Sequence, residues 1–312
     1  MQGRIHAICI SERRGTAKVE VPEARLKEDW GIEQDAHGGR WHRQVSLLAL
    51  EEIEAFRSRG AQVAFGAFGE NLVVEGFDLA ALAVGTRFQI GEALLELTQI
   101  GKECHSHCAI YHQVGDCIMP RKGVFTRVLK GGTIHPGDAV ELIPPAADRP
   151  FTAAVITLSD KGAAGSREDK SGPLAAELLQ NAGYEVVETL LLNDDPGPLK
   201  RQLIRLADQR QVDLILTTGG TGFSRRDNAP EATIAVCDRM ANGIAEAIRA
   251  YSLTITPRAM LSRGVSGLRK GSLIVNLPGS PKAVREALEY ILPTLDHGLG
   301  ILRGTAGECA RS

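Results

Sequence analysis

The glycine-rich run Gly219-Gly220-Thr221-Gly222 is the first segment whose composition points to chemistry. Glycine has no Cβ, so a ligand can approach the backbone closely, and successive N–H groups in such turns bind anions. A helix that begins near Pro230 adds the positive end of its dipole, and Thr221 adds a hydroxyl donor. The run fits a phosphate cradle, and it fits equally an ordinary tight turn that needs a positive φ.

Two acidic residues strengthen the phosphate interpretation. Asp227 follows the glycine run, and Asp194 lies in the loop Asn193-Asp194-Asp195. A carboxylate beside a phosphate is unfavourable unless a cation lies between them, and Mg2+ commonly bridges carboxylates to phosphate oxygens. Asp227 and Asp194 are therefore candidate Mg2+ ligands of a phosphoryl- or nucleotidyl-transfer site. Both also fit a simpler role as N-caps of helices near residues 230 and 197.

A second dense segment, Cys104-His105-Ser106-His107-Cys108, lies in the first half of the chain. Two cysteines and two histidines could hold zinc, but this spacing lacks the turn that tetrahedral ligation requires. A reactive thiol is the favoured interpretation, because Lys102 and the histidines stabilise a thiolate. The alternative is a cysteine buried in a strand, which fits Cys9 and Cys237.

Strands and helices alternate in the second half. Strands are expected at 153–158, 185–191, 212–217 and 272–277, and helices at 173–182, 197–209, 230–237 and 281–291. Alternating βαβ units predict a three-layer α/β fold with a mostly parallel sheet covered by helices. In such sheets ligands bind beyond the carboxyl ends of the strands, and there this sequence has polar or glycine-rich loops.

The first half has a different pattern. Short strands are expected at 5–10, 45–50, 71–74, 87–90, 94–100 and 140–143, with one helix at 51–59. This spacing predicts a β-rich, barrel-like domain over residues 1–143. Three prolines mark a stiff linker at 144–150, which separates it from a second domain at 151–304 and a tail at 305–312.

The composition is that of an ordinary globular protein. The length of 312 residues favours two domains, and aromatic residues make up only 4%, so the cores are expected to be aliphatic. Lys and Arg number 36 and Asp and Glu 38, which gives no electrostatic case for binding nucleic acid or an anionic membrane. No apolar run reaches membrane-spanning length and no signal peptide is found, so a cytoplasmic location is predicted.

Several runs in the second half occur in the order of one known family. They are 157–160, 169–173, 217–222, 226–233, 261–263 and 276–284. Together they resemble the molybdopterin-binding fold of the MogA and gephyrin G-domain family, over about residues 150–303. The resemblance implies a homotrimer formed through this domain, and molybdopterin adenylyltransferase activity. In that reaction AMP moves from ATP to the terminal phosphate of molybdopterin, with Mg2+ and release of pyrophosphate. The chain departs from the family at Asn228-Ala229, where Val-Thr is commoner.

By this resemblance Asp227 is the essential aspartate and Asp194 the second important acid, and both are expected to bind Mg2+. The residues expected to bind nucleotide or molybdopterin are Ser159, Asp160, Ser171, Gly172, Gly219, Gly220, Thr221, Gly222, Arg226, Ser262, Asn276, Pro278, Gly279 and Ser280. In-line attack on the α-phosphorus needs positioning and charge neutralisation, which glycine loops, a metal carboxylate and a cation such as Arg225 or Arg226 supply.

The first half resembles a MOSC domain. The runs that carry the resemblance are 3–5, 8–11, 31–37, 41–48, 68–72, 84–86, 100–105 and 136–138. It implies a β-rich fold that associates with molybdenum cofactor, sulfur or both, through a cysteine that is either Cys104 or Cys108, with Cys108 favoured. Asp35, His37, His42 and Arg43 are expected to line the same cavity, and the alternative for these four is a solvated loop.

The leading hypothesis is a bifunctional enzyme that adenylates molybdopterin and binds or sulfurates the cofactor, with other cofactor-biosynthesis proteins as partners. One alternative is a protein that stores or delivers finished cofactor without turnover. The other is a sulfur-transfer protein whose C-terminal domain serves for docking. Asp227 and Asp194 favour the enzyme, because a carrier has no need of magnesium carboxylates.

Overall fold

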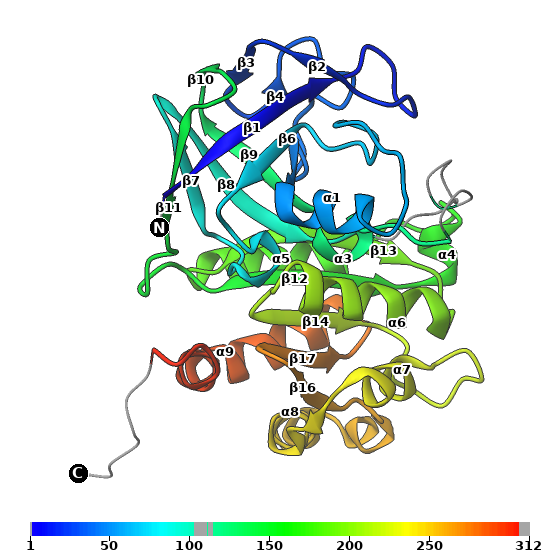
Figure 1. Cartoon of the computed structure of the whole chain (residues 1–312). Coiled ribbons are helices and arrows are strands. Elements are labelled where there is room, and N and C mark those ends of the chain that lie inside the picture. Colours follow the sequence, from blue (N-terminus) through cyan, green and yellow to red (C-terminus); the bar gives the residue numbers. More distant parts are fainter. Residues whose placement is uncertain (1, 103–110, 112–114, 306–312) are drawn as a thin grey trace. The chain divides into compact units, whose positions relative to one another are not determined.

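The computed structural model describes residues 2–102, 111 and 115–305, and the chain forms two compact units, Met1–Ala146 and Ala147–Ser312 (Figure 1). The division lies inside the segment 144–150, and each unit has its own hydrophobic core. Among the described residues, none of the helices combines the length and the apolar composition that a membrane span requires.

A closed barrel forms the N-terminal unit. Its strands are β1 (Gln2–Ile10), β5 (Val45–Ala49), β6 (Leu72–Glu75), β7 (Arg87–Ile90), β8 (Ala93–Ile100), β9 (Val124–Lys130) and β11 (Ala139–Ile143). The order around the barrel is β11-β7-β8-β9-β5-β6-β1, and β1 pairs with β11 to close it (Figure 1). All these pairings are antiparallel except that of β5 with β6. The predicted barrel-like fold is confirmed.

Side chains of β5 alternate between two hydrophobic cores, one inside the barrel and one between the barrel and the helix next to it. Val45 and Leu47 belong to the cluster inside the barrel, whereas Leu48 packs outside it with Ile53 and Phe56 of the helix α1 (Leu50–Arg57). The remaining elements are β2 (Val19–Val21), β3 (Ala24–Lys27), β4 (Gly31–Ile32), η1 (Leu79–Ala81), α3 (Met119–Lys122) and β10 (Gly132–Ile134). β2 pairs with β1, and β3 joins β4 and β10 in a small separate sheet.

One mixed sheet forms the centre of the C-terminal unit. Its strands are β12 (Thr152–Leu158), β13 (Glu185–Leu192), β14 (Leu214–Thr218), β15 (Arg239–Met240), β16 (Ser266–Arg269) and β17 (Ser272–Leu277). Their order is β13-β12-β14-β17-β16-β15. The first four strands pair in parallel, whereas β16 is antiparallel to both of its neighbours, β17 and β15, so the predicted mostly parallel sheet is confirmed.

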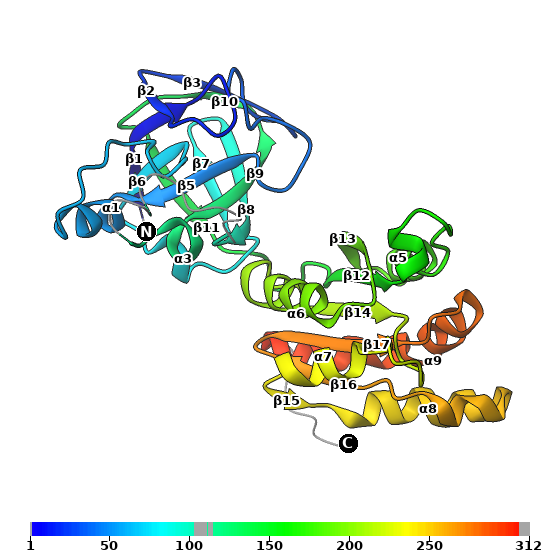
Figure 2. The ribbon, with the colours of Figure 1, turned by 90° about the vertical axis from the view of Figure 1, so that its right-hand side faces the viewer.

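Helices cover both faces of this sheet (Figure 2). They are α4 (Asp160–Ala163), α5 (Ser171–Asn181), α6 (Pro196–Ile204), α7 (Ala229–Val236), α8 (Asn242–Ile255) and α9 (Pro281–Arg303). Ala153 and Val155 of β12 pack in one core with α5, α8 and α9, and Ala154 and Ile156 pack in the other with α6 and α7. This alternation produces the three predicted layers.

Two predicted helices differ from the structure by more than a residue or two at their C-terminal ends. The helix expected at 197–209 is α-helical only to Ile204, and Arg205–Gln209 forms a wider π-helical turn. The helix expected to end at residue 291 continues through Pro293 to Arg303. Leu295 and Leu299 continue its buried face beyond that proline, so packing outweighs the lost backbone donor.

Candidate functional site

Four parallel strands of the C-terminal sheet end at one edge. Leu158 lies opposite Leu192, and Thr218 lies opposite both Thr157 and Leu277. The loops that follow these strands are 159–160, 193–195, 219–222 and 278–280. Loops that are far apart in the sequence therefore meet at the edge where parallel α/β sheets bind ligands.

The glycine run forms a tight turn, and several of its backbone N–H groups have no acceptor within the described part of the protein. Gly219 and Gly220 have φ values of +99° and +64°. A Cβ on Gly219 would lie 2.4 Å from the carbonyl oxygen of Leu158. Within the described part of the chain, no protein acceptor binds any of the consecutive N–H groups from Gly220 to Phe223. Of the four residues only Thr221 is buried, and Phe223 is exposed, so this row of N–H groups is open to water or to an anion.

Replacing Gly219 with alanine should lower the free energy of unfolding by about 1–3 kcal/mol, because it combines a left-handed φ with a close contact. Gly243, in the first turn of α8, has open space around its Cβ position and provides the matched control. Gly243→Ala should leave stability unchanged or raise it by up to about 1 kcal/mol. Urea unfolding of both variants measures the difference, and equal stabilities would contradict this reading of the turn.

Asp194 and Asp160 hold two of the loops together. The Asp160 N–H donates to Asp194 Oδ2 at 2.9 Å, and the Asp194 N–H donates to Asp160 Oδ1 at 3.0 Å. The simpler role expected for Asp194 is wrong, because its neighbour Asp195 caps α6 by accepting from the Gly197 N–H at 2.9 Å. Burial raises the pKa of Asp194, and the negative charges of Asp160 and Asp227 raise it further.

Asp227 and Arg226 lie at the end of the glycine loop. Asp227 Oδ2 accepts from the Ser224 N–H at 3.0 Å, and Asn228 is the N-cap residue of α7, so Asp227 does not cap that helix. Arg226 binds both carboxylate oxygens of Asp160, at 2.9 and 2.6 Å. This ion pair holds the pKa of Asp160 below its usual range and connects the glycine loop to the first loop.

This acidic cluster fits a cation that arrives with a phosphate. The negative charges of Asp160 and Asp227 both act unfavourably on the charged form of Asp194, and a divalent ion beside Asp194 would relieve that repulsion. Among the described residues, no group of three or more acidic, histidine or cysteine side chains converges into a complete metal site. Mg2+ needs only one or two carboxylates and completes its shell with water and phosphate oxygens, so Asp194 and Asp227 suit it.

A cavity of about 710 Å³ opens beside the glycine loop. Ser159, Ser171, Gly279 and Ser280, all expected to bind substrate, contribute to its lining. Arg167, Glu168, Asp169 and Lys170 line it as well. The Ser171 hydroxyl donates to the Gly279 carbonyl at 2.8 Å, so this serine joins two walls of the cavity. The size is within the ordinary range of small-molecule sites.

Four other predicted residues have structural contacts beside this cavity. Asn276 is buried, and its amide donates to the hydroxyls of Thr217 and Thr233 at 2.8 and 2.9 Å. Pro278 accepts from the Thr218 hydroxyl at 2.7 Å, and Ser262 accepts from the Gly264 N–H at 3.4 Å. Gly172 leaves no space for a Cβ, which would lie 2.3 Å from Thr157 Oγ1. These residues shape the loops around the cavity.

In the N-terminal unit, Asp35 is part of a buried ion pair. Its side chain and that of Lys18 are each 1% exposed, and the two groups are in direct contact. Asp35 also accepts from the Ser11 N–H at 3.0 Å, the Asn71 amide at 3.2 Å and the His37 N–H at 2.9 Å. Burial alone would raise the Asp35 pKa, but the hydrogen bonds from His37 and Lys18 outweigh it and lower the pKa. Asp35 is therefore not a solvated loop residue.

His42 and Arg43 contact residues of β8 and β9. His42 Nε2 is 2.9 Å from Gln99 Oε1. The Arg43 guanidinium lies 4.9 Å from the Trp41 ring centre and 5.6 Å from that of Phe125, and Lys102 lies 6.0 Å from the same Phe125 ring. Two cations therefore lie over one aromatic ring, and one of them, Lys102, directly precedes residue 103 in the sequence.

Cys104 and Cys108, with the zinc alternative that includes His105 and His107, lie outside the described residues. Cys9 is buried in β1, as expected, and burial raises the pKa of its thiol to about 12. Cys237 was expected in a strand, but it lies at the C-terminal end of α7 and is half-buried. Burial raises its thiol pKa to about 11, so neither cysteine is a thiolate at neutral pH.

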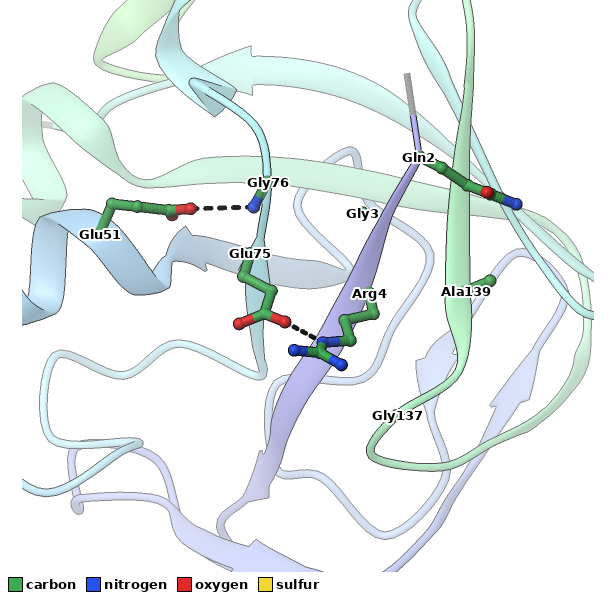
Figure 3. Close-up of a pocket in the computed structure, with 8 residues that line it drawn as sticks. All are labelled: Gln2, Gly3, Arg4, Glu51, Glu75, Gly76, Gly137 and Ala139. Carbon is green, nitrogen blue, oxygen red and sulfur yellow. Dashed lines mark hydrogen bonds and ion pairs between the residues drawn. The ribbon is translucent and has the colours of Figure 1, made fainter.

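A second cavity, of about 530 Å³, lies at the rim of the barrel (Figure 3). The side chain of Arg4 points toward Glu75 and forms an ion pair with it, and Glu51 accepts from the Gly76 N–H at 2.9 Å (Figure 3). Its lining thus has two carboxylates and one guanidinium. This charge does not suit an anionic pterin, and Asp35, His37, His42 and Arg43 are not among the residues that line the cavity.

Lys18 and Arg263 are the two important residues that sequence reasoning missed. Lys18 is a single lysine in a polar segment, so nothing in the sequence marks it as buried. Arg263 belongs to the run 261–263, which was singled out, although only Ser262 was expected to act. Its side chain contacts the glycine loop and the residues around Asp227.

Comparisons with known proteins agree with both halves of this description. Residues 154–297 match the family described as the probable molybdopterin binding domain, and residues 33–141 match the MOSC domain. The chain is 40% identical over 152 residues to the molybdopterin adenylyltransferase of Helicobacter pylori, a match that covers 48% of this chain and 86% of that protein. It is 43% identical over 140 residues to the Escherichia coli enzyme of the same name, covering 44% and 71%.

Among solved structures, the molybdopterin biosynthesis enzyme MoaB of Thermus thermophilus is 46% identical, with 49% of this chain and 97% of that chain covered and a TM-score of 0.48. The two family matches assign the second half of the chain to the probable molybdopterin binding domain and the first half to the MOSC domain. This chain belongs to the molybdopterin adenylyltransferase family, a family of nucleotidyltransferases in molybdenum cofactor biosynthesis, and it carries a MOSC domain in its N-terminal half.

Proposed function

We propose that the C-terminal unit is a Mg2+-dependent molybdopterin adenylyltransferase. An oxygen of the terminal phosphate of molybdopterin attacks the α-phosphorus of ATP. The bond between that phosphorus and the oxygen bridging to the β-phosphate breaks, and pyrophosphate leaves. The products are adenylyl-molybdopterin and pyrophosphate, and no covalent bond to the protein is required.

The observation that carries this proposal is the open row of N–H groups from Gly220 to Phe223, next to Asp194, Asp227 and Arg226. The row donates hydrogen bonds to phosphate oxygens, which replace the missing acceptors. Asp194 and Asp227 would hold Mg2+, which would neutralise charge on the phosphates. Arg226 exchanges its ion pair with Asp160 for a phosphate oxygen and adds a second positive charge.

The cavity lined by Ser159, Ser171, Gly279 and Ser280 supports a second substrate beside the first. Its serine hydroxyls and glycine backbone offer hydrogen bonds to a polar ring system, and its volume matches a small molecule. Two substrates on adjacent loops of one sheet edge meet the requirement for proximity in a transfer reaction.

For the N-terminal unit we propose handling of molybdenum cofactor or its sulfur, through Cys104 or Cys108 together with Asp35, His37, His42 and Arg43. The thiol is the chemical group for sulfur transfer or metal ligation, and positive charge of the kind that Arg43 and Lys102 carry favours its thiolate form. Assembly as a homotrimer through the C-terminal unit and a cytoplasmic location belong to the same proposal.

Purified protein mixed with molybdopterin, ATP and Mg2+ should release pyrophosphate and form adenylated pterin in equal amounts. Omitting Mg2+ or adding a chelator should stop both products, because the phosphates then lack their bridging cation. A protein that binds molybdopterin but forms no adenylated pterin would be a carrier, and that result would exclude the enzyme proposal.

A further inference from the structure

Arg263 donates hydrogen bonds to carbonyl groups of the glycine loop from both its backbone and its side chain. Its backbone N–H donates to the Thr221 carbonyl at 2.9 Å, and its Nε donates to the Gly222 carbonyl at 2.8 Å. Its Nη2 donates to the Asp227 carbonyl at 2.5 Å. One residue therefore binds the loop at both ends of the segment that contains Phe223, Arg225 and Arg226.

These contacts determine where the open N–H groups point. In a trans peptide the carbonyl of one residue and the N–H of the next point in opposite directions, and no cis peptide bond is found among the described residues. Because the carbonyls of Thr221 and Gly222 point toward Arg263, the N–H groups of Gly222 and Phe223 point away from it. These two groups belong to the open row described above.

The same guanidinium is connected to the position of Asp227. Its bond to the Asp227 carbonyl fixes the backbone of the residue whose carboxylate accepts from the Ser224 N–H. Glu231, in the first turn of α7, binds the outer nitrogen of Arg263 and holds the guanidinium in this orientation. Although burial alone would raise the pKa of Glu231, its hydrogen bond with Arg263 lowers it.

We propose that Arg263 is a positioning residue for adenylyl transfer. It holds the N–H groups of Gly222 and Phe223 and the carboxylate of Asp227 in register, so that phosphate and Mg2+ bind at one place. This role rests on the proposed function of the C-terminal unit. It requires arginine, because a planar fork reaches two carbonyls at once, whereas a lysine ammonium is a point charge on a flexible stem.

The test compares Arg263→Ala and Arg263→Lys with the unchanged protein. Arg263→Ala should lower kcat for adenylated pterin by about 100-fold, the scale of a loss from misplaced reacting groups. Arg263→Lys keeps the charge but should remain at least about tenfold below the unchanged protein. Binding of Mg2+ pyrophosphate, measured by calorimetry without turnover, should weaken by about tenfold in both variants.

Arg249 provides the matched control, because it also donates to a backbone carbonyl, that of Gly264 at 2.6 Å, next to Arg263 in the sequence, yet it forms no hydrogen bond or ion pair with the described residues 221–227. Arg249→Lys should leave kcat and pyrophosphate binding within about twofold of the unchanged protein. Circular dichroism and Tm measurements check that each variant is folded. If Arg263→Ala does not fold, the test rests on Arg263→Lys.

The outcomes separate this inference from the function it rests on. Full restoration of kcat by lysine, or a kcat per folded molecule for Arg263→Ala within about threefold of the unchanged protein, would refute the positioning role. If the unchanged protein makes no adenylated pterin, the proposed function fails. In that case pyrophosphate binding that is lost in Arg263→Ala still supports the positioning of the loop, and equal binding contradicts it.

Discussion

Replacing Asp227 with asparagine is expected to lower kcat for adenylated pterin by about 100- to 1000-fold, a typical loss when one preorganised charge-stabilising group is removed. The side-chain oxygen of asparagine can still accept from the Ser224 N–H, so the loop keeps its shape. The variant loses only the negative charge that Mg2+ requires. The measurement is the initial rate of pyrophosphate release as a function of Mg2+ concentration.

Asp195→Asn is the matched control for this prediction. Asp195 lies beside Asp194 but accepts from the Gly197 N–H at the start of α6, and asparagine caps helices as well as aspartate does. Its kcat should stay within about twofold of the unchanged protein. An Asp227→Asn variant that retains full activity at every Mg2+ concentration would remove this aspartate from the mechanism.

In the other unit, Asp35→Asn should lower the free energy of unfolding by about 3–5 kcal/mol, because it leaves the Lys18 ammonium buried without its counter-ion. Asp29→Asn is the control, since Asp29 pairs with Arg40 at 3.6 Å while both side chains are more than half exposed. That exposed pair should contribute less than about 1 kcal/mol. Urea unfolding followed on the N-terminal unit compares the two variants, and similar losses would contradict the buried-pair interpretation.

The same ion pair has a pH dependence with a defined sign. The folded-state pKa of Asp35 is lowered, so its contribution to stability is fully present above the unfolded value of about 4 and is lost as the pH falls toward the folded value. The stability difference between the unchanged protein and Asp35→Asn should therefore narrow below about pH 4. A difference that grows on acidification would reverse the assignment.

Patterns within one element predicted much of this fold. The bounds of β7 and β17 agree with the sequence expectation, because each is a short apolar run between turn residues. α8 was missed, since Ala241 at its start makes no side-chain cap and gives no start signal. β16 was missed because its sequence, Ser-Gly-Leu-Arg, is a weak strand former. A Cβ on its Gly267 would lie 2.6 Å from Cys237 Sγ, so close packing explains the glycine.

The candidate site likewise contains residues that the sequence predicted and residues that it did not. Asp194, Asp227 and the glycine run could be found from the sequence, because each follows a strand and has a chemistry of its own. Arg263 binds Glu231, which is 32 residues away in the sequence, and Lys18 binds Asp35, which is 17 residues away. No local sequence pattern encodes such contacts. The roles of such residues become visible only when the fold brings the partners together.

Closure of the barrel by β1 and β11 has a consequence for synthesis. Gln2 pairs with Glu141 and Arg4 with Ala139, so β1 meets this partner only after β11, the last strand of the unit, has left the ribosome. Chains grow at about 5–20 residues per second, which is slow compared with local hairpin formation. Until β11 arrives, one side of β1 offers unpaired backbone groups to other nascent chains or to chaperones. The N-terminal unit is therefore most exposed to misassembly during its own translation.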